Sequence, residues 1–137
     1  MFEKVLLAVD GSEHSAKAVP VAVDIARKSQ GEVLVYHVRE HVTGRGGRWE
    51  LEDAPRADEL VERVGSEVAA AGVKAKTEVD QALSGHVAQA IIDAAAARGV
   101  DLVVMGSRGL SDLRGLMLGS VTHKVIHLSH CAVLVAR

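Results

Sequence analysis

The chain has 137 residues, a formal net charge of −2 and a hydrophobic content of 48%, with one Trp, one Tyr and one Phe. This length predicts a single domain over 1–137 whose core is built from Val, Leu, Ile and Ala. The charge gives no basic footprint, so nucleic acid is not expected as a partner. No apolar run approaches the about 20 residues that span a bilayer, and the N-terminus lacks a signal-peptide pattern, so no membrane partner is expected. With Cys131 as the one cysteine, these features predict a cytoplasmic protein.

Apolar runs alternate with segments of helical periodicity along the chain. The expected strands are 5–9, 33–38, 73–79, 101–105 and 132–136, and the expected helices are 13–29, 54–71, 85–98 and a fourth that ends at 129. Pro20 lies inside the first helical pattern, where it predicts either a kink or a late helix start. Residues 41–53 are rich in glycine and arginine and show no periodicity, so a mobile loop is expected there.

The third expected strand differs from the others because it alternates, with Lys74, Lys76 and Glu78 on one face. Strands buried in a parallel sheet read as unbroken apolar runs, so this strand is expected at an edge. Strand order 2-1-3-4-5 would bury its lysines at a cost of several kcal/mol. The predicted fold is therefore α/β, a three-layer sandwich with four helices around a five-stranded parallel sheet of order 3-2-1-4-5. In that order a ligand cleft lies beyond the carboxyl ends of strands one and four.

A glycine-rich turn follows the fourth strand and leads into the last helix. Gly106, Gly109 and Gly119 allow close approach of the backbone to a ligand, and Ser120 or Thr122 can cap the helix that follows. The start of a helix offers unpaired N–H groups and a partial positive charge. The turn therefore predicts an anion site, of which phosphate is the most common occupant.

The spacing Gly106-x2-Gly109-x9-Gly119-Ser120 resembles the ATP-binding signature of the universal stress protein family. The flanking residues 103–111 and 116–121 are similar to that family almost letter for letter. The similarity extends from Lys4 to Val135 and is thinnest between 41 and 53. It implies an adenine nucleotide alpha hydrolase-like fold and a nucleotide-dependent regulatory role in stress survival.

The resemblance also implies how ATP is held. Phosphates are expected on the N–H groups of Gly109, Gly119, Ser120 and Val121, and the base on the backbone at Val38. Asp10 is expected to contact the ribose or a divalent metal on the phosphates, the alternative being that it only shapes its turn. Arg108 either screens phosphate charge or is a solvated loop residue. The predicted ATP-binding residues are Ala8, Val9, Asp10, Val38, Met105, Gly106, Arg108, Gly109, Gly119, Ser120 and Val121.

Catalysis has weaker support in the sequence. No Gly-x-x-x-x-Gly-Lys-[Ser/Thr] motif occurs, so the lysine that P-loop enzymes use is missing. No residue near the cleft is a clear general base, and His14 is expected on the surface, so no catalytic residue is assigned. The prediction is ATP binding with Mg²⁺ or Mn²⁺ and at most slow hydrolysis. The alternatives are a slow ATP hydrolase and a protein-interaction module that binds no nucleotide.

Two other interpretations are weighed. His123 and His127 lie four residues apart, close to His130 and Cys131, which suggests zinc. The favoured alternative places both helical histidines on the outer face and Cys131 at a buried strand start. A phosphate-accepting receiver domain is disfavoured because a second acidic residue beside strand one and a lysine after strand five are missing.

The last expected strand is apolar on both faces although the predicted order leaves it at an edge. Exposed apolar edges favour pairing, so a two-fold homodimer through Val133, Leu134 and Val135 is expected, as in the family. Family members often have Pro-Cys-Pro before this strand, where this chain has His130-Cys131-Ala132.

Overall fold

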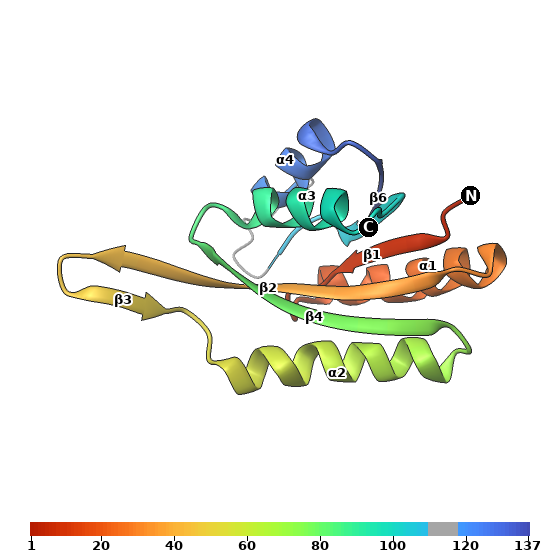
Figure 1. The fold of residues 1–137 in the computed structure, drawn as a ribbon, viewed down its shortest axis with the longest axis horizontal. Helices are drawn as coiled ribbons and strands as arrows, with labels where there is room; N and C mark the ends of the chain where they lie inside the picture. The colour runs from red at the N-terminus through yellow and green to blue at the C-terminus, as the bar shows by residue number, and fades with distance from the viewer. Residues whose placement is uncertain (110–117) are drawn as a thin grey trace.

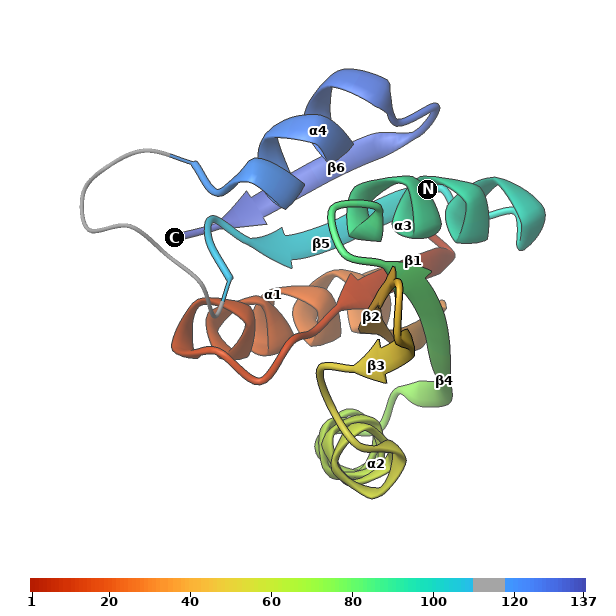
Figure 2. The ribbon, with the colours of Figure 1, turned by 90° about the vertical axis from the view of Figure 1, so that its left-hand side faces the viewer.

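In the computed structural model, which describes residues 1–109 and 118–137, one sheet lies between two layers of helices (Figures 1 and 2). The strands are β1 Lys4–Ala8, β2 Glu32–Gly44, β3 Gly47–Glu50, β4 Lys74–Leu83, β5 Leu102–Gly106 and β6 Ala132–Ala136. The helices are α1 Glu13–Ser29, α2 Ala54–Ala70, α3 Val87–Ala97 and α4 Ser120–Leu128. Most of the x9 spacer of the glycine signature lies outside the described residues.

The five parallel strands lie in the order β4-β2-β1-β5-β6, which confirms the predicted order 3-2-1-4-5. Among the described strands β4 pairs with β2 alone, from Glu32↔Lys74 to His41↔Leu83. The predicted edge position of this strand is thus confirmed, and the Lys74 and Lys76 side chains are 70% and 60% exposed. Keeping these ammonium groups in water avoids the cost of burying them.

The mobile loop expected over 41–53 is wrong. β2 continues to Gly44 and turns into β3, which pairs with it antiparallel from His41↔Glu50 to Gly44↔Gly47. We call residues 41–50 the arm; Figure 1 shows it projecting beyond the rest of the sheet. The Trp49 ring lies over the turn, close enough that a Cβ added to Gly46 would be 3.1 Å from it. The sheet therefore has six strands instead of five.

The two faces of the sheet bury separate apolar clusters, which makes the three layers. Val33 and Val35 of β2 pack with α1 and α2, whereas Leu34 and Tyr36 point to the opposite face, toward α3. This alternation follows from the two-residue period of a strand. The fully buried Tyr36 donates its phenolic hydrogen to Asp80 Oδ2 at 2.7 Å.

The start of α1 agrees with the expected helix 13–29, whereas the cap of α4 differs from expectation. α1 begins at Glu13, because the Ser12 hydroxyl accepts a hydrogen bond from Ser15 N at 3.1 Å, and the helix continues through Pro20. The late start considered for α1 is therefore wrong. α4 has Gly119 as its N-cap and no side-chain cap, so the expected Ser120 or Thr122 cap is wrong as well.

Hydrogen bonds and ion pairs link the strands and loops at the amino end of the sheet. Asp101 accepts from Glu3 N at 3.0 Å and Lys4 N at 3.2 Å, and Glu32 N donates to Glu3 O at 2.8 Å. The Glu32 carboxylate lies 3.3 Å from Lys74 Nζ. Burial acts to raise the pKa of Glu32, but its lysine neighbours outweigh burial, and this pKa lies below its usual value.

None of the helices in the described part of the chain has the length and apolar character needed to cross a bilayer.

Candidate functional site

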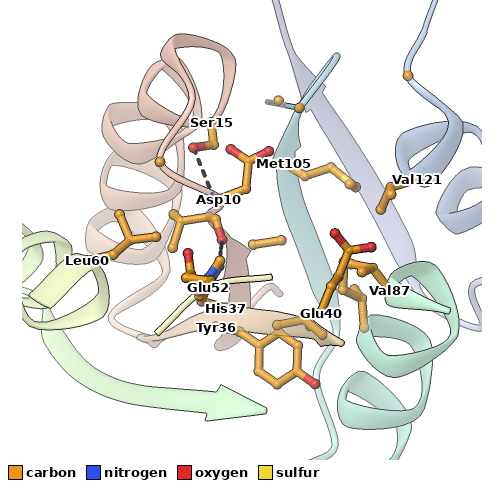
Figure 3. A pocket seen from close by; sticks show the side chains of 18 of the residues that line it. Asp10, Ser15, Tyr36, His37, Glu40, Glu52, Leu60, Val87, Met105 and Val121 are labelled. Carbon is orange, nitrogen blue, oxygen red and sulfur yellow. Dashed lines mark hydrogen bonds and ion pairs between the residues drawn. The ribbon is translucent and has the colours of Figure 1, made fainter. Parts of the chain in front are cut away.

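A cavity of about 1120 Å³ opens at the carboxyl ends of the parallel strands (Figure 3). This is the edge of the sheet at which the predicted topology locates a ligand. All of the predicted ATP-binding residues line this cavity: Ala8, Val9, Asp10, Val38, Met105, Gly106, Arg108, Gly109, Gly119, Ser120 and Val121. The structure thus brings together residues that are spread over more than a hundred positions of sequence.

Gly106, at the end of β5, is held tightly between two helices. A Cβ at this position would lie 2.5 Å from the carbonyl carbon of His14 and 2.9 Å from Ser15 N, both backbone atoms of α1. On the α4 side, the Thr122 hydroxyl donates to Gly106 O at 2.9 Å. Glycine is therefore required here for close packing as well as for any approach to a ligand.

The first turn of α4 faces the cavity. Gly119 N donates to Ser107 O at 2.8 Å, so the expectation that the Gly119 N–H is available to a phosphate is wrong. The first intrahelical bond runs from His123 N to Gly119 O at 2.9 Å. The N–H groups of Ser120 and Val121 precede that bond and have no carbonyl partner among the described residues. These two donors lie at the positive end of the helix and line the cavity, an arrangement that is chemically suited to an anion.

Asp10 has one oxygen in its own turn and one toward the cavity. Its Oδ1 accepts from Ser12 N at 2.9 Å, as an aspartate that shapes a turn does. A Cβ on Gly109 would lie 2.6 Å from Asp10 Oδ2, so this second oxygen lies against the glycine turn after β5. The aspartate is therefore placed to shape its turn and to present an oxygen beside the glycine turn at the same time.

The edge of β2 that faces β1 has an interruption inside the cavity. The last hydrogen bond toward β1 runs from Val9 N to Tyr36 O at 3.0 Å, and the next bond on this edge runs from Leu51 N to Glu40 O at 3.0 Å. Val38 lies between them on the same edge, and none of the described backbone groups bonds to its N–H or C=O there. We call this interruption the Val38 gap. It leaves one donor and one acceptor side by side in the wall of the cavity.

His37 is a cavity residue that sequence reasoning passed over. Its side chain is 5% exposed, with Nδ1 2.7 Å from Val9 O and Nε2 2.6 Å from Glu52 Oε1. A carbonyl oxygen can only accept, so Nδ1 donates to Val9 O, and the other ring nitrogen, Nε2, is in hydrogen-bond contact with the Glu52 carboxylate. Through these two contacts His37 links Val9, after the end of β1, to Glu52, in the segment that follows the arm. In the sequence, His37 is a single histidine within an apolar run, and its partner Glu52 is 15 residues away. The sequence alone therefore does not indicate the contact.

The helices supply the remaining wall of the cavity. Apolar side chains of α3 face it, and charged side chains of α2 and α4 form its rim. These residues are Val87, Ala88 and Ile91 of α3, Arg56, Glu59, Glu62 and Arg63 of α2, and Lys124 of α4. Helical spacing carries the signal for each group, but only the fold shows that the groups share one cavity.

The histidines of α4 lie elsewhere. His123 and His127 are exposed, as expected, with ring centroids 4.5 Å apart. Cys131 is half-buried instead of buried, because it lies just before the edge strand β6. Across residues 1–109 and 118–137, no three His, Cys, Asp or Glu side chains come together as a set of metal ligands.

Comparison with known proteins gives a consistent result. The family model described as the universal stress protein family matches residues 1–137. The chain is 39% identical to universal stress protein YxiE of Bacillus subtilis over 151 aligned residues, with full coverage of both proteins. It is also 39% identical, over 139 aligned residues with full coverage of both, to a universal stress protein of Thermus aquaticus.

Two solved structures extend the comparison to ligands. A universal stress protein in complex with cAMP is similar with a TM-score of 0.76 and 25% identity, covering 99% of this chain and 97% of that one. A universal stress protein from Archaeoglobus fulgidus in complex with dAMP has a TM-score of 0.73 and 22% identity, covering 100% and 98%. The second comparison shows the shared fold. On the match over its whole length and on these relatives, the chain belongs to the universal stress protein family.

Proposed function

We propose that this protein binds ATP in the cavity at the carboxyl ends of β1 and β5 and acts as a nucleotide-dependent regulatory module in the stress response, in the cytoplasm. The observation that carries the proposal is one cavity that joins the Val38 gap to the open first turn of α4. The gap suits a base edge and the helix start suits phosphates, so the two ends of one nucleotide have complementary partners. That relatives are solved with cAMP and dAMP supports an adenine nucleotide.

The Val38 gap is complementary to the Watson–Crick edge of adenine. Adenine presents an acceptor, N1, next to a donor, the 6-amino group, and the gap presents an N–H next to a C=O. Ala8 and Met105 are apolar residues of the same wall, which suits the faces of the base. Because backbone groups make this contact, the side chain at position 38 does not decide it.

The phosphate end is supported by donors and charge. The N–H groups of Ser120 and Val121 and the hydroxyl of Ser120 lie at the positive end of α4. Lys124 and Arg108 line the same region and add positive charge. Asp10 Oδ2, next to Gly109, suits a ribose hydroxyl or a Mg²⁺ or Mn²⁺ ion carried by the phosphates.

Binding without rapid turnover is the favoured form of this activity. Hydrolysis needs a group that accepts a proton from water, and His37, the buried histidine of the cavity, is bonded at both ring nitrogens. A slow Mg²⁺- or Mn²⁺-dependent ATP hydrolase is the second candidate, since an ion at Asp10 would polarise a phosphate. A nucleotide-independent interaction module is the third.

The proposal includes a homodimer through β6. Val133, Leu134 and Val135 are half-buried in an edge strand, and Ile126 and Leu128 of the neighbouring α4 are 43% and 54% exposed. Pairing of two β6 strands would satisfy their free backbone edges and cover apolar surface. Sedimentation of a monomer at micromolar concentration would remove this part of the proposal.

Calorimetric titration with ATP tests the function, and Ser120→Pro is its sharpest variant. Gly119 is extended, with φ −64° and ψ 159°, which proline tolerates in the preceding residue, and proline is compatible with a first helical position. The substitution removes the Ser120 N–H, whereas the matched control Ser120→Ala removes only the hydroxyl. We expect Ser120→Pro to weaken ATP binding about tenfold more than Ser120→Ala, as loss of one bond to a charged group does.

Two measurements on the native protein distinguish the remaining alternatives. Denaturation of purified protein should release an adenine nucleotide, and phosphate release with Mg²⁺ or Mn²⁺ separates binding from slow hydrolysis. If ATP binds to neither the native protein nor its variants, the proposal of ATP binding is overturned.

A further inference from the structure

Glu40 places a carboxylate in the part of the cavity that is otherwise apolar. Its side chain follows Tyr36 and Val38 on the α3 face of β2, because strand side chains alternate between faces. Figure 3 shows it reaching into the cavity beside Val87, on the side away from His37 and Glu52. The backbone position is fixed, since Glu40 O accepts from Leu51 N at 3.0 Å.

This carboxylate has no protein partner in the part of the chain that the structure describes, residues 1–109 and 118–137, where neither a hydrogen bond nor an ion pair reaches it. Glu52, by contrast, is bonded to His37, and Asp10 to Ser12 N. A carboxylate side chain offers two acceptor oxygens for hydrogen bonds from a ligand. The cavity therefore holds an acceptor that is available to a ligand.

We propose that Glu40 accepts a hydrogen bond from the 6-amino group of the bound adenine and so selects 6-amino purines over 6-oxo purines. This inference rests on the proposed ATP binding and deepens it. The amino group has two hydrogens, one for the carbonyl of the Val38 gap and one for a second acceptor on the same side. Glu40, two residues further along the same strand face, supplies that acceptor.

Charge explains the direction of the selection. A 6-oxo purine presents an oxygen where adenine presents the amino group, so it would face the Glu40 carboxylate and the Val38 carbonyl with no hydrogen between them. The acidic residues Glu59 and Glu62 lie on α2, across the sheet from α3, and do not share this position. Glu40 thus acts as a specificity-determining residue for the base.

The experiment compares ATP, inosine triphosphate and purine riboside triphosphate on the native protein and on Glu40→Ala, by calorimetry. Inosine triphosphate carries a 6-oxo group, and purine riboside triphosphate carries no substituent at that position. We expect Glu40→Ala to weaken ATP about tenfold, equal to about 1.4 kcal/mol, and to leave purine riboside triphosphate nearly unchanged. The preference for ATP over inosine triphosphate should fall by at least the same factor.

The matched control is Glu67→Ala, which removes one exposed carboxylate of α2 outside the cavity and should leave all three affinities unchanged. Thermal unfolding verifies that Glu40→Ala is folded. Should that variant not fold, Glu40→Gln takes its place: its side-chain amide can donate to a 6-oxo group, so the preference for ATP over inosine triphosphate should fall, and an unchanged preference overturns the inference. An unchanged ATP preference in Glu40→Ala overturns the inference and leaves ATP binding standing. Failure of the native protein to bind any of the three ligands overturns both.

Discussion

The two ends of the parallel sheet contrast in how they treat polar groups. At the amino end, the Asp101 carboxylate accepts from backbone N–H groups and the Glu32 carboxylate pairs with lysines, so both carboxylates have protein partners. At the carboxyl end, the Val38 gap and the first turn of α4 leave donors and an acceptor without protein partners in the described chain. The contrast teaches that completed hydrogen bonds stabilise the amino end, whereas the backbone groups left without partners at the carboxyl end are the ones that a ligand could bind.

The largest expected effects come from one glycine at each end. A Cβ on Gly31 would lie 2.7 Å from Glu3 Cα, and a Cβ on Gly106 would meet the backbone of His14 and Ser15. Gly31→Ala and Gly106→Ala should each lower the free energy of unfolding by about 2–3 kcal/mol, since backbone atoms yield little to overpacking. Urea denaturation measures these losses. ATP affinity of the folded protein should fall with Gly106→Ala alone, because only that glycine lines the cavity.

Gly44→Ala is the control for both glycines. A Cβ on Gly44 would be 3.4 Å from the Trp49 ring, which is an ordinary contact, so the free energy of unfolding should change by less than about 0.5 kcal/mol. Loss of ATP affinity in Gly31→Ala equal to that in Gly106→Ala would break the contrast between the two ends.

The next effect concerns His37, a residue of the carboxyl end whose two ring nitrogens both have protein partners. His37→Leu leaves Val9 O and the Glu52 carboxylate without their partner, at an expected cost of about 2 kcal/mol in the free energy of unfolding. Glu52→Gln keeps an amide that can bond to Nε2 and should cost about half as much or less. Denaturation at neutral pH gives both values. Equal stability of His37→Leu and the native protein would show that this link does not stabilise the carboxyl end.

The smallest effect lies under the cavity, at Tyr36. Burial raises the pKa of the Tyr36 phenol above its usual value, and the hydrogen bond to Asp80 raises it further. A raised pKa contributes stability that is complete below about pH 10, the value of the unfolded chain, and is lost as the pH rises above it. Tyr36→Phe should therefore cost about 1 kcal/mol at neutral pH and make stability above about pH 10 less dependent on pH.

Tyrosine absorbance provides the measurement. Tyr36 is the chain's single tyrosine, so the phenolate band reports on it alone. In the folded protein this band should stay absent until the chain unfolds at high pH. A phenolate that forms with the ordinary tyrosine value in folded protein would contradict the buried hydrogen bond.

The order of the sheet follows from the sequence because its evidence is local. The alternation of Lys74, Lys76 and Glu78 identifies an edge strand, and short apolar runs identify the strands between which the cavity forms. The glycine turn can likewise be predicted from the spacing of Gly106, Gly109 and Gly119. These patterns repeat over a few residues, so they can be recognised without the rest of the fold.

The base side of the cavity does not follow from the sequence because it depends on pairing. The bonds between β1 and β2 end at Tyr36, and further along β2 the strand β3 pairs with it. The arm is extended because of this pairing, so residues 41–50 appear irregular when the sequence is considered alone. The contact of His37 depends on Glu52, which is distant in sequence. The role proposed for Glu40 depends on the Val38 gap, which only the strand pairing creates. The wrong assignment of the Gly119 N–H has a similar cause, since its acceptor, Ser107, is 12 positions earlier.

The arm carries the chain's single tryptophan, and this gives the protein a built-in optical probe. Trp49 lies over the turn of the arm, and Leu51, two residues later, already lines the cavity. Indole emission and its anisotropy therefore report on the segment beside the cavity without an attached dye, and any rearrangement there during a titration becomes visible in real time.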